Sequence, residues 1–272
     1  MRTGRLLGSG RTADVYELHD DEPESGAARP GPLPEGPEAD TPHLPADRDA
    51  SDTPPRDPAG GARAWVLRRY RDDWGDAVAE AEVMEYVRSH GYPVPRVRSA
   101  TRAEMVLERL SGPTMLEAFA SGLLGPDRAG AALAHLLRTL HALPPRGHAS
   151  DRRVLHLDLH PENVIVTPYG PQVIDWSNAE EGPPGLDWGI SAMILAQVAV
   201  DTADFRAAMA HATLVSLLAH QSDGPSALTE EGLVEARRRR AAQPTMSARE
   251  VELMGAAEEL IRTLKGPGRA AT

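Results

Sequence analysis

The sequence predicts an α+β protein in which the strands come first and the helices follow. Short runs of β-branched and aromatic residues mark strands before residue 111, and apolar residues recur at helical spacing over most of residues 111–272. A pair of apolar, strand-like runs within residues 163–175 interrupts this helical part. We therefore predict two lobes, a small β-rich N-lobe over residues 1–110 and a larger, mainly helical C-lobe over residues 111–272.

The first element is a glycine-rich turn between two strands. Residues 8–16 read Gly-Ser-Gly-Arg-Thr-Ala-Asp-Val-Tyr, a G-x-G-x-x-A-x-V pattern. Glycines there let the backbone approach phosphate groups and supply amide donors without a Cβ in the way. A plain hairpin turn is the commoner explanation of such a pattern by itself. The surroundings lack the strand-then-helix context of a dinucleotide fingerprint and the Gly-Lys pair of a P-loop.

Residues 20–62 differ in composition from the rest of the chain. They contain eleven Asp and Glu but three Arg, a balance of −8 that leaves −3 of the formal charge of −11 for all other residues. Rich in Pro, Gly and Ala, the segment lacks the apolar surface that would offset the ordering of its backbone. We predict a disordered insertion between two strands, with an inert role favoured over a regulatory one. The small remaining charge does not indicate a substrate.

The next segments alternate between strand and helix patterns. Residues 65–70 and 105–110 are predicted strands, and residues 76–90 place apolar side chains at helical spacing until Gly91 ends the pattern. The prolines at residues 93–95 then favour an extended exit. Further helices are predicted over residues 115–123, 127–142, 184–200, 201–220, 230–242 and 247–265.

Three oxygen-bearing side chains surround the predicted hairpin in the helical part. Its strands are predicted over residues 163–167 and 172–175, joined by a four-residue turn. Asp158 and Asn163 enter the first strand and Asp175 leaves the second, so one end of the hairpin collects all three. Phosphoryl transfer from a nucleotide needs such a set, because one carboxylate receives the acceptor's proton while an amide and a second carboxylate hold Mg²⁺.

The spacing around Asp158 is the most specific signal in the chain. His156, Asp158 and Asn163 stand in the order H-x-D-x-x-x-x-N, and an apolar hairpin and an Asp follow, as in the kinase signature. His156 and His160 would also suit a transition metal, but the chain has no Cys and no third His at ligand spacing nearby. We therefore favour phosphoryl transfer over a transition-metal site.

Nothing in the composition points to secretion, a membrane or nucleic acid. The first sixteen residues lack the apolar core of a secretory signal, and the longest apolar run, residues 190–200, is too short to cross a bilayer. That run is typical of a buried helix. The arginines at residues 237–240 would spread around a helix, so a solvated face is favoured. We expect a cytoplasmic protein without membrane or nucleic-acid partners, and the oligomeric state stays open.

The chain resembles the aminoglycoside phosphotransferase family, part of the protein-kinase-like superfamily that also includes choline kinases. Residues 156–163, His-Leu-Asp-Leu-His-Pro-Glu-Asn, carry the motif H-x-D-x-H-P-x-N, whereas protein kinases usually have Arg before the Asp. Segments 91–95, 105–108 and 140–144 are also typical of the family. The resemblance covers nearly the whole chain outside residues 20–62 and implies a protein-kinase-like two-lobed fold.

The resemblance implies a role for each residue of the predicted site. Asp158 would be the catalytic base that orients the acceptor hydroxyl, and Asn163 and Asp175 would bind Mg²⁺. The hinge from Glu108 to Leu110 would meet the adenine through its backbone. The loop over the nucleotide phosphates would contain Gly8, Ser9, Gly10, Arg11 and Val15.

Two further residues are expected to support the catalytic loop. By the same resemblance Asp187 would brace the loop from below, with a simple helix cap as the alternative. His156 would pack beneath the loop rather than react.

The chain departs from the family at one position. The family has a Lys on the third strand, which binds the nucleotide phosphates and pairs with a helix Glu, but the single Lys of this chain is Lys265. Arg68 is the best substitute, with Glu80 as its expected partner. A guanidinium binds phosphate through two N–H groups but is not the point charge of an ammonium. Because Arg replaces Lys throughout the chain, compositional drift also explains the change.

The leading hypothesis is a Mg²⁺-dependent kinase that transfers the γ-phosphoryl group of ATP or GTP to a hydroxyl of an aminoglycoside-like or other small molecule. The alternative is a catalytically weak or inactive nucleotide-binding module, which the missing Lys favours. A protein kinase is a weaker third option, because no activation segment fits between Asp175 and residues 187–189. The acceptor is not identified. Four acidic residues of the helical part would suit a cationic acceptor, but positions on the solvated faces of helices are the favoured explanation for them. These residues are Asp201, Asp204, Glu230 and Glu231.

Overall fold

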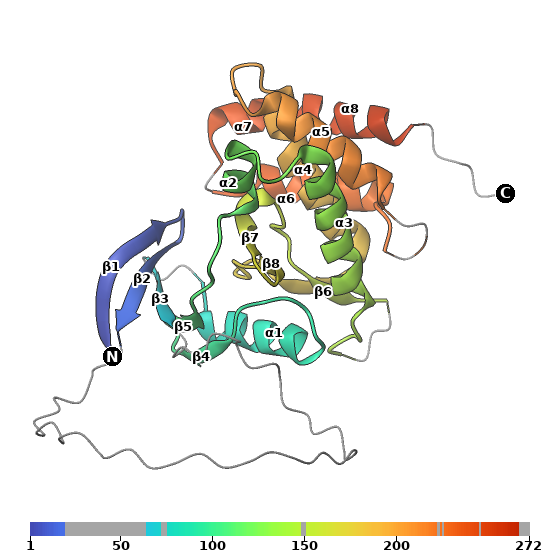
Figure 1. Ribbon diagram of the computed structural model, residues 1–272. Helices are drawn as coiled ribbons and strands as arrows, with labels where there is room; N and C mark the ends of the chain where they lie inside the picture. Colours follow the sequence, from blue (N-terminus) through green and yellow to red (C-terminus); the bar gives the residue numbers. More distant parts are fainter. Residues whose placement is uncertain are drawn as a thin grey trace, which may run out of the picture.

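The computed structural model describes residues 1–19, 64–71, 75–147, 151–221, 224, 226–244 and 246–266. The predicted disordered insertion over residues 20–62 lies outside the described residues. In the described part, an antiparallel sheet and one helix form the N-terminal part, and helices form most of the rest. Figure 1 shows the sheet at one side of the molecule and most of the helices at the other. The predicted α+β class is confirmed.

The sheet consists of β1 (Arg2–Ser9), β2 (Ala13–His19), β3 (Trp65–Tyr70), β4 (Val97–Ala100) and β5 (Glu104–Glu108). The strand order is β1-β2-β3-β5-β4, and all neighbours are antiparallel. The strand predicted over residues 65–70 is confirmed, whereas the one predicted over residues 105–110 ends at Glu108. β4 was not predicted, because a strand of four residues with a half-exposed pattern leaves little periodicity to detect.

Helix α1 (Ala77–Ser89) confirms the prediction for residues 76–90 to within one residue at each end. Asp76 caps it, since its side chain accepts hydrogen bonds from Val78 N at 3.0 Å and Ala79 N at 3.2 Å. Glu80 lies on the buried face of this helix and is 4% exposed. A carboxylate in such a position needs polar partners, and the neighbouring strand supplies them.

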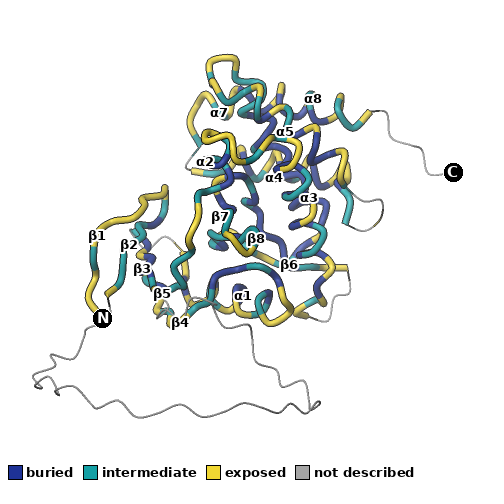
Figure 2. The backbone as a smooth tube through the Cα atoms, in the orientation of Figure 1, coloured by how far each residue is buried: buried dark blue, intermediate teal, exposed yellow. Residues whose placement is uncertain are grey.

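The C-terminal part contains α2 (Met115–Ala120), α3 (Pro126–Ala142), α4 (Pro184–Val200), α5 (Ala207–Ala219), α6 (Glu230–Ala241), α7 (Ala248–Glu252) and α8 (Met254–Lys265). α4 contacts α5, α6 and α8 and is buried along most of its length (Figure 2). This confirms the predicted buried helix at residues 190–200. Across the part of the chain that the structure describes, no helix has the length and apolarity to span a membrane.

Three predicted helices differ from the observed ones. The helix predicted over residues 115–123 ends at Ala120. The helix predicted over residues 201–220 begins at Ala207, because the side chains of Asp201 and Asp204 each accept a bond from the amide two residues ahead and hold this segment in turns. The helix predicted over residues 247–265 is divided at Leu253 into α7 and α8. Apolar spacing does not report this break, because Val251 of α7 continues the helical spacing of α8 although α7 buries none of its residues.

A hairpin of β7 (Val164–Thr167) and β8 (Gly170–Val173) lies between α3 and α4 in the sequence and confirms the predicted hairpin with a tighter turn. Thr167 pairs with Gly170, so the turn has two residues rather than the four predicted. Asn163 belongs to a short 3-10 turn, η1 (Pro161–Asn163), and not to the strand as predicted. Two three-residue strands, β6 (Arg153–Leu155) and β9 (Glu180–Gly182), pair beside the hairpin and were not predicted.

Candidate active site

The loop that carries Asp158 is held from below by Asp187, the first-turn carboxylate of α4. Asp187 Oδ2 accepts a hydrogen bond from His156 N at 2.9 Å, and Oδ1 accepts one from Leu157 N at 2.8 Å. Leu157 has a φ of 59°, a conformation that a bulky residue rarely adopts unless its surroundings impose it. The expected brace is therefore confirmed, and the helix-cap alternative is wrong because Asp187 accepts no bond from its own helix N-terminus.

Buried polar groups reinforce this brace. His141 Nε2 lies 3.0 Å from Asp187 Oδ2, and both side chains are fully buried. Burial alone would raise the pKa of Asp187, but the hydrogen bond and charge of His141 and the bonds from the loop amides hold it below its usual value. Asp187 is thus ionised and fixes the entry of the loop.

His156 packs beneath the loop, as expected. Its Nδ1 accepts a bond from Asp158 N at 3.2 Å, and its Nε2 lies 3.1 Å from Ile174 O. The ring also packs edge-on against Trp176. Burial lowers the pKa of His156, so the ring is neutral and supports the loop.

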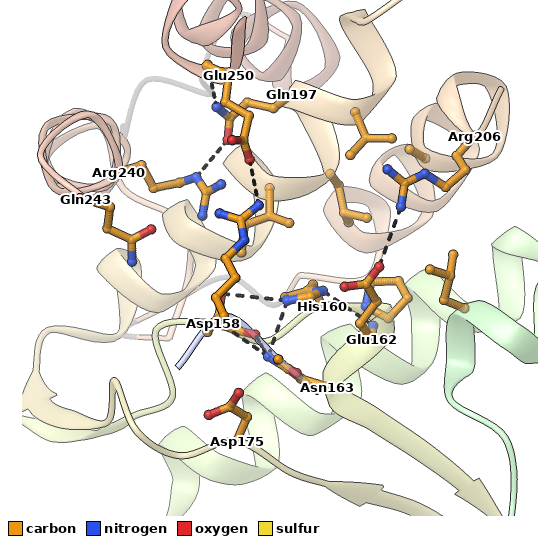
Figure 3. A pocket seen from close by; sticks show the side chains of 18 of the residues that line it. Asp158, His160, Glu162, Asn163, Asp175, Gln197, Arg206, Arg240, Gln243 and Glu250 are labelled. Atoms are coloured by element: carbon orange, nitrogen blue, oxygen red, sulfur yellow. Dashed lines mark hydrogen bonds and ion pairs between the residues drawn. The ribbon is translucent and has the colours of Figure 1, made fainter. Parts of the chain in front are cut away.

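Asp158 and Asn163 are direct neighbours. Asn163 Nδ2 donates to Asp158 O at 2.9 Å and to Asp158 Oδ2 at 3.1 Å. These bonds leave Asn163 Oδ1 without a donor among the described residues. Figure 3 shows Asp158, Asn163 and Asp175 grouped in the lower part of the pocket.

Asp175 is fixed by a buried arginine. Arg68 Nη2 donates to Asp175 Oδ1 at 2.5 Å, while Arg68 Nη1 donates to Glu80 Oε1 at 2.6 Å. The expected pair of Arg68 with Glu80 is present, and the bond to Asp175 is an addition that sequence reasoning missed. Burial alone would lower the pKa of Arg68 and raise that of Asp175, but their attraction reverses both shifts. Asp175 also has a φ of 62°, a strained conformation that often marks a functional position.

Glu80 is the buried partner that holds Arg68 in place. Its carboxylate also accepts hydrogen bonds from Tyr70 Oη and, at 2.9 Å, from Trp176 N. Burial raises the pKa of Glu80 to about 7, although the charge of Arg68 opposes the shift. The sheet, α1 and the segment after β8 are therefore joined at one buried cluster.

A cleft of about 1060 Å³ lies over these residues. Ser9, Gly10 and Arg11 of the glycine-rich turn line it together with the loop that carries Asp158, so residues about 150 positions apart in the sequence face the same space. Arg11 Nη2 lies 3.3 Å from Glu250 Oε1 of α7, which connects the turn to the helical part. The other predicted site residues lie outside the lining; these are Gly8, Val15, Arg68, Glu80, Glu108 and Leu110.

The residues of the predicted hinge lie beside the sheet. Glu108 N donates to Arg96 O at 2.9 Å, and Glu108 Oε2 accepts a bond from Arg96 N at 3.2 Å. Arg109 N donates to Ala64 O at 2.9 Å. The side chain of Glu108 therefore has a structural partner, as expected for a hinge that would act through its backbone.

The arginine run gives one correction. Arg237, Arg238 and Arg239 are partly or fully exposed and each pairs with a glutamate, but Arg240 is 8% exposed and lines the cleft. The expectation of a solvated face is wrong for this residue. The signal was available in the sequence, because Arg240 continues the apolar stripe of Leu233 and Ala236 at helical spacing.

The acidic residues of the helical part give another correction. Asp201 and Asp204 line the cleft rather than a solvated face. Each is paired with an arginine, Asp201 with Arg249 at 3.1 Å and Asp204 with Arg206 at 2.7 Å. Two acidic residues fit the expectation of a solvated face, since both are exposed and neither lines the cleft; these are Glu230 and Glu231.

The donor set beside Asp158 suits a hard divalent cation. Asn163 Oδ1 and Asp175 Oδ2 have no donor among the described residues, and amide and carboxylate oxygens are the ligands that Mg²⁺ and Ca²⁺ prefer. No group of three or more His, Cys, Asp or Glu in the described ranges is arranged to hold a metal ion alone. A cation here would share its ligands with nucleotide phosphates and water.

The sequence matches a family model described as a phosphotransferase enzyme family, over residues 57–153 and 122–230. One similar solved structure is the amicoumacin kinase hAmiN in complex with AMP-PNP, Ca²⁺ and Ami, with 13% sequence identity, a TM-score of 0.48 and coverage of 94% of this chain and 87% of that chain. Another is an aminoglycoside-3'-phosphotransferase of type VIII, with 17% identity, a TM-score of 0.38 and coverage of 74% and 86%. No curated protein matches by sequence.

Proposed function

Because the chain belongs to the phosphotransferase enzyme family, we propose that it transfers the γ-phosphoryl group of ATP or GTP to a hydroxyl group of a small molecule. The observation that carries the proposal is that Asp158 and Asn163 share a hydrogen bond in a cleft where Asp175 lies close by and the glycine-rich turn faces them. Phosphoryl transfer depends on this positioning of charges and donors rather than on covalent chemistry by the protein.

Asp158 is the proposed catalytic base. The acceptor oxygen forms a bond to the γ-phosphorus, and the bond from that phosphorus to the β–γ bridging oxygen breaks, so its electron pair leaves with the nucleoside diphosphate. The hydroxyl proton passes to the Asp158 carboxylate. Asn163 and the loop amides held by Asp187 keep that carboxylate in place.

Asn163 and Asp175 are the proposed ligands of Mg²⁺. The bound cation would neutralise charge on the nucleotide phosphates. The exposed turn of Ser9, Gly10 and Arg11 is proposed to lie over the same phosphates, and its Gly10 amide shapes the turn by donating to Ala13 O at 2.9 Å. Arg68 is proposed to act with them by holding Asp175, and Glu80 fixes Arg68.

The two parts of the chain are proposed to divide the work. Residues 1–110 would form the nucleotide-binding lobe, with adenine at the backbone of Glu108 and Leu110 and the phosphates under the turn from Gly8 to Val15. Residues 111–272 would supply the catalytic loop and the acceptor site. A nucleotide-binding module without transfer is the second candidate, and the commitment of both Arg68 terminal nitrogens to carboxylates favours it.

Acceptor-dependent formation of ADP or GDP tests the proposal. Purified protein with MgATP or MgGTP should produce it with at least one member of a panel of small alcohols, sugars and amino alcohols, and not with a generic protein substrate. Asp158→Asn is the negative control. Nucleotide binding without transfer to any acceptor would instead establish the binding module, and transfer to the protein substrate alone would establish a protein kinase.

A further inference from the structure

One charged side chain of the cleft has no ionic partner. Arg240, on α6, is 8% exposed, yet no Asp or Glu of the described residues forms an ion pair with it. Its Nε donates to Gln197 Oε1 at 2.7 Å, and its Nη2 lies 3.7 Å from the Met246 sulfur, a weak acceptor. A guanidinium carries five N–H donors, so most of the donors on its terminal nitrogens are unused.

Three neighbouring arginines of the cleft are already paired with carboxylates. Arg249 pairs with Asp201, Arg206 pairs with Asp204, and Arg11 with Glu250. Arg240 is different, because it is buried and forms no ion pair with any carboxylate of the described residues. Burial lowers the pKa of Arg240, with the charges of Asp158 and Glu250 opposing the shift, but an arginine stays charged in a protein. An unpaired buried charge is expensive for the fold and is therefore a candidate for function.

Arg240 is also held in a defined orientation. The amide of Gln197, on α4, donates to Glu250 O at 2.8 Å and to the Met254 sulfur at 3.4 Å, so its oxygen faces Arg240. Gln197 is 4% exposed. This support fixes the Nε edge of the guanidinium and leaves most of the N–H groups on the two terminal nitrogens for a ligand, since only Nη2 has a weak contact with the Met246 sulfur. A planar fork of this kind binds carboxylates and phosphates through two parallel hydrogen bonds.

Arg240 lies in the helical part of the cleft, near Glu250, to which Arg11 of the glycine-rich turn also reaches. Figure 3 shows Arg240 and Asp175 on opposite sides of Asp158, with Gln243 beside Arg240. Asp175 is where the metal-bound phosphates of the nucleotide are proposed to lie. Arg240 is therefore on the side from which the acceptor hydroxyl would approach Asp158.

We propose that Arg240 binds an anionic group, a carboxylate or a phosphate, on the acceptor itself. This inference rests on the proposed function. It narrows the acceptor to hydroxylated acids or phosphorylated alcohols, because an anion at Arg240 and a hydroxyl at Asp158 would then belong to one molecule. A polycationic acceptor would leave the guanidinium unpaired and add like charge beside it.

Matched pairs of compounds test this proposal. The pairs are D-glycerate with glycerol, D-gluconate with D-glucitol, and glucose 6-phosphate with glucose, which share hydroxyl groups and differ in the anion. Affinity is measured by protection from thermal unfolding, with and without MgADP, and transfer by ADP formation from MgATP. Wild type should favour at least one anionic member over its neutral partner by about tenfold or more, and Arg240→Gln should reduce that preference to about twofold or less.

Two variants control for folding and for charge. Arg238→Gln removes a surface arginine of the same helix and should behave as wild type. Arg240→Lys keeps the charge without the fork and should retain part of the preference. If Arg240→Gln fails to fold, the wild-type comparison and Arg240→Lys still decide the question.

Three results would overturn the inference. First, wild type could bind neutral or amine-bearing compounds as well as the acids. Second, Arg240→Gln could keep the anion preference. Third, Arg240→Gln could weaken the binding of MgATP as strongly as that of the acids, which would assign Arg240 to the nucleotide. Transfer to neutral acceptors without an anion preference would refute the inference and leave the proposed function standing. An Arg240-dependent anion preference without any transfer would support the inference and refute the proposed function.

Discussion

Asp158 and Asp175 are carboxylates of one cleft with different surroundings. Asp158 is bonded to the amide of Asn163 and has no arginine partner among the described residues, whereas Asp175 is paired with Arg68 and bonded to Ser177. The first is suited to accept a proton and the second to remain ionised beside a cation. Substituting each should therefore have a different effect.

Asp158→Asn should abolish transfer while leaving nucleotide binding intact. The variant keeps the shape of the side chain and removes its basicity, so we expect phosphorylation of any acceptor to fall by roughly 10²-fold or more with little change in MgATP affinity. Asp175→Asn should weaken MgATP itself because it removes a proposed metal ligand. Measuring the transfer rate and the equilibrium affinity for MgATP in each variant checks both predictions. Equal transfer by wild type and Asp158→Asn would refute the catalytic assignment.

Arg68 should matter for nucleotides that carry phosphates. We expect Arg68→Ala to weaken MgATP by about tenfold or more, which is ~1.4 kcal/mol, and adenosine by much less, because only ATP carries the charges involved. Arg68→Lys should retain much of the affinity. Arg69→Ala is a matched control. Arg69 lies next to Arg68 on the same strand, but it is exposed and pairs with Glu104. Equal loss of adenosine and MgATP affinity would show that Arg68 supports only the fold.

Glu80 predicts a pH dependence of stability. Its pKa is about 7 in the folded chain against an ordinary value of 4.5, so the folded chain binds this proton more tightly than the unfolded chain. The free energy of unfolding should therefore fall as pH rises from about 4.5 through about 7, by up to about 1.4 kcal/mol per pH unit. Denaturant unfolding of wild type and Glu80→Gln between pH 5 and 8 measures this change in the free energy of unfolding. The wild type should lose stability relative to the variant, and parallel profiles would contradict the prediction.

At the scale of elements, close packing of α3 on α5 depends on Gly130. A Cβ at this position would lie 2.5 Å from Thr213 O and 2.5 Å from Ser216 Cβ. Gly255 in α8 has open space around it instead. The two glycines therefore have opposite roles, although both lie in helices.

Gly130→Ala should destabilise the protein by about 1–3 kcal/mol, because the two helices must separate to admit the methyl group. Gly255→Ala should be neutral or stabilising by up to about 1 kcal/mol, because Ala favours the helix more than Gly. Chemical denaturation of both variants checks the signs. A stable Gly130→Ala variant would show that α3 and α5 adjust easily at this contact.

At the scale of the whole molecule, the insertion joins two strands that are already paired. Leu18 of β2 is paired with Trp65 of β3, so the chain ends on either side of residues 20–62 lie close together. A short connection can close such a hairpin, and the entropic cost of closing a longer connection grows only slowly with its length.

Replacing residues 22–61 with a short Gly/Ser linker should leave the melting temperature and nucleotide affinity nearly unchanged. The reason is the composition of this segment, which offers little apolar surface to the core. Thermal unfolding and MgATP binding of the shortened chain check this. A loss of more than about tenfold in affinity, or ~1.4 kcal/mol in stability, would assign the segment a structural or regulatory role.

The sequence alone determined the α+β class, most of the long elements and the group around Asp158. These properties depend on local periodicity and on fixed spacing, as in the helix ended by Gly91 and the motif from His156 to Asn163. The predicted partnership of Arg68 with Glu80 is also present in the structure. The break at Leu253 was missed, because apolar spacing does not change there.

Only the tertiary structure decided which side chains share the cleft and which of them are paired. The link from Arg68 to Asp175 joins residues 107 positions apart, and no local pattern encodes it. Asp201 and Asp204 look like solvated acids in the sequence, yet each lies in the cleft beside an arginine. Arg240 is buried between Gln197 of α4 and Met246, and within the described part of the chain it forms no ion pair. Helical spacing places a residue on a face, but only the packing of other helices decides what that face meets.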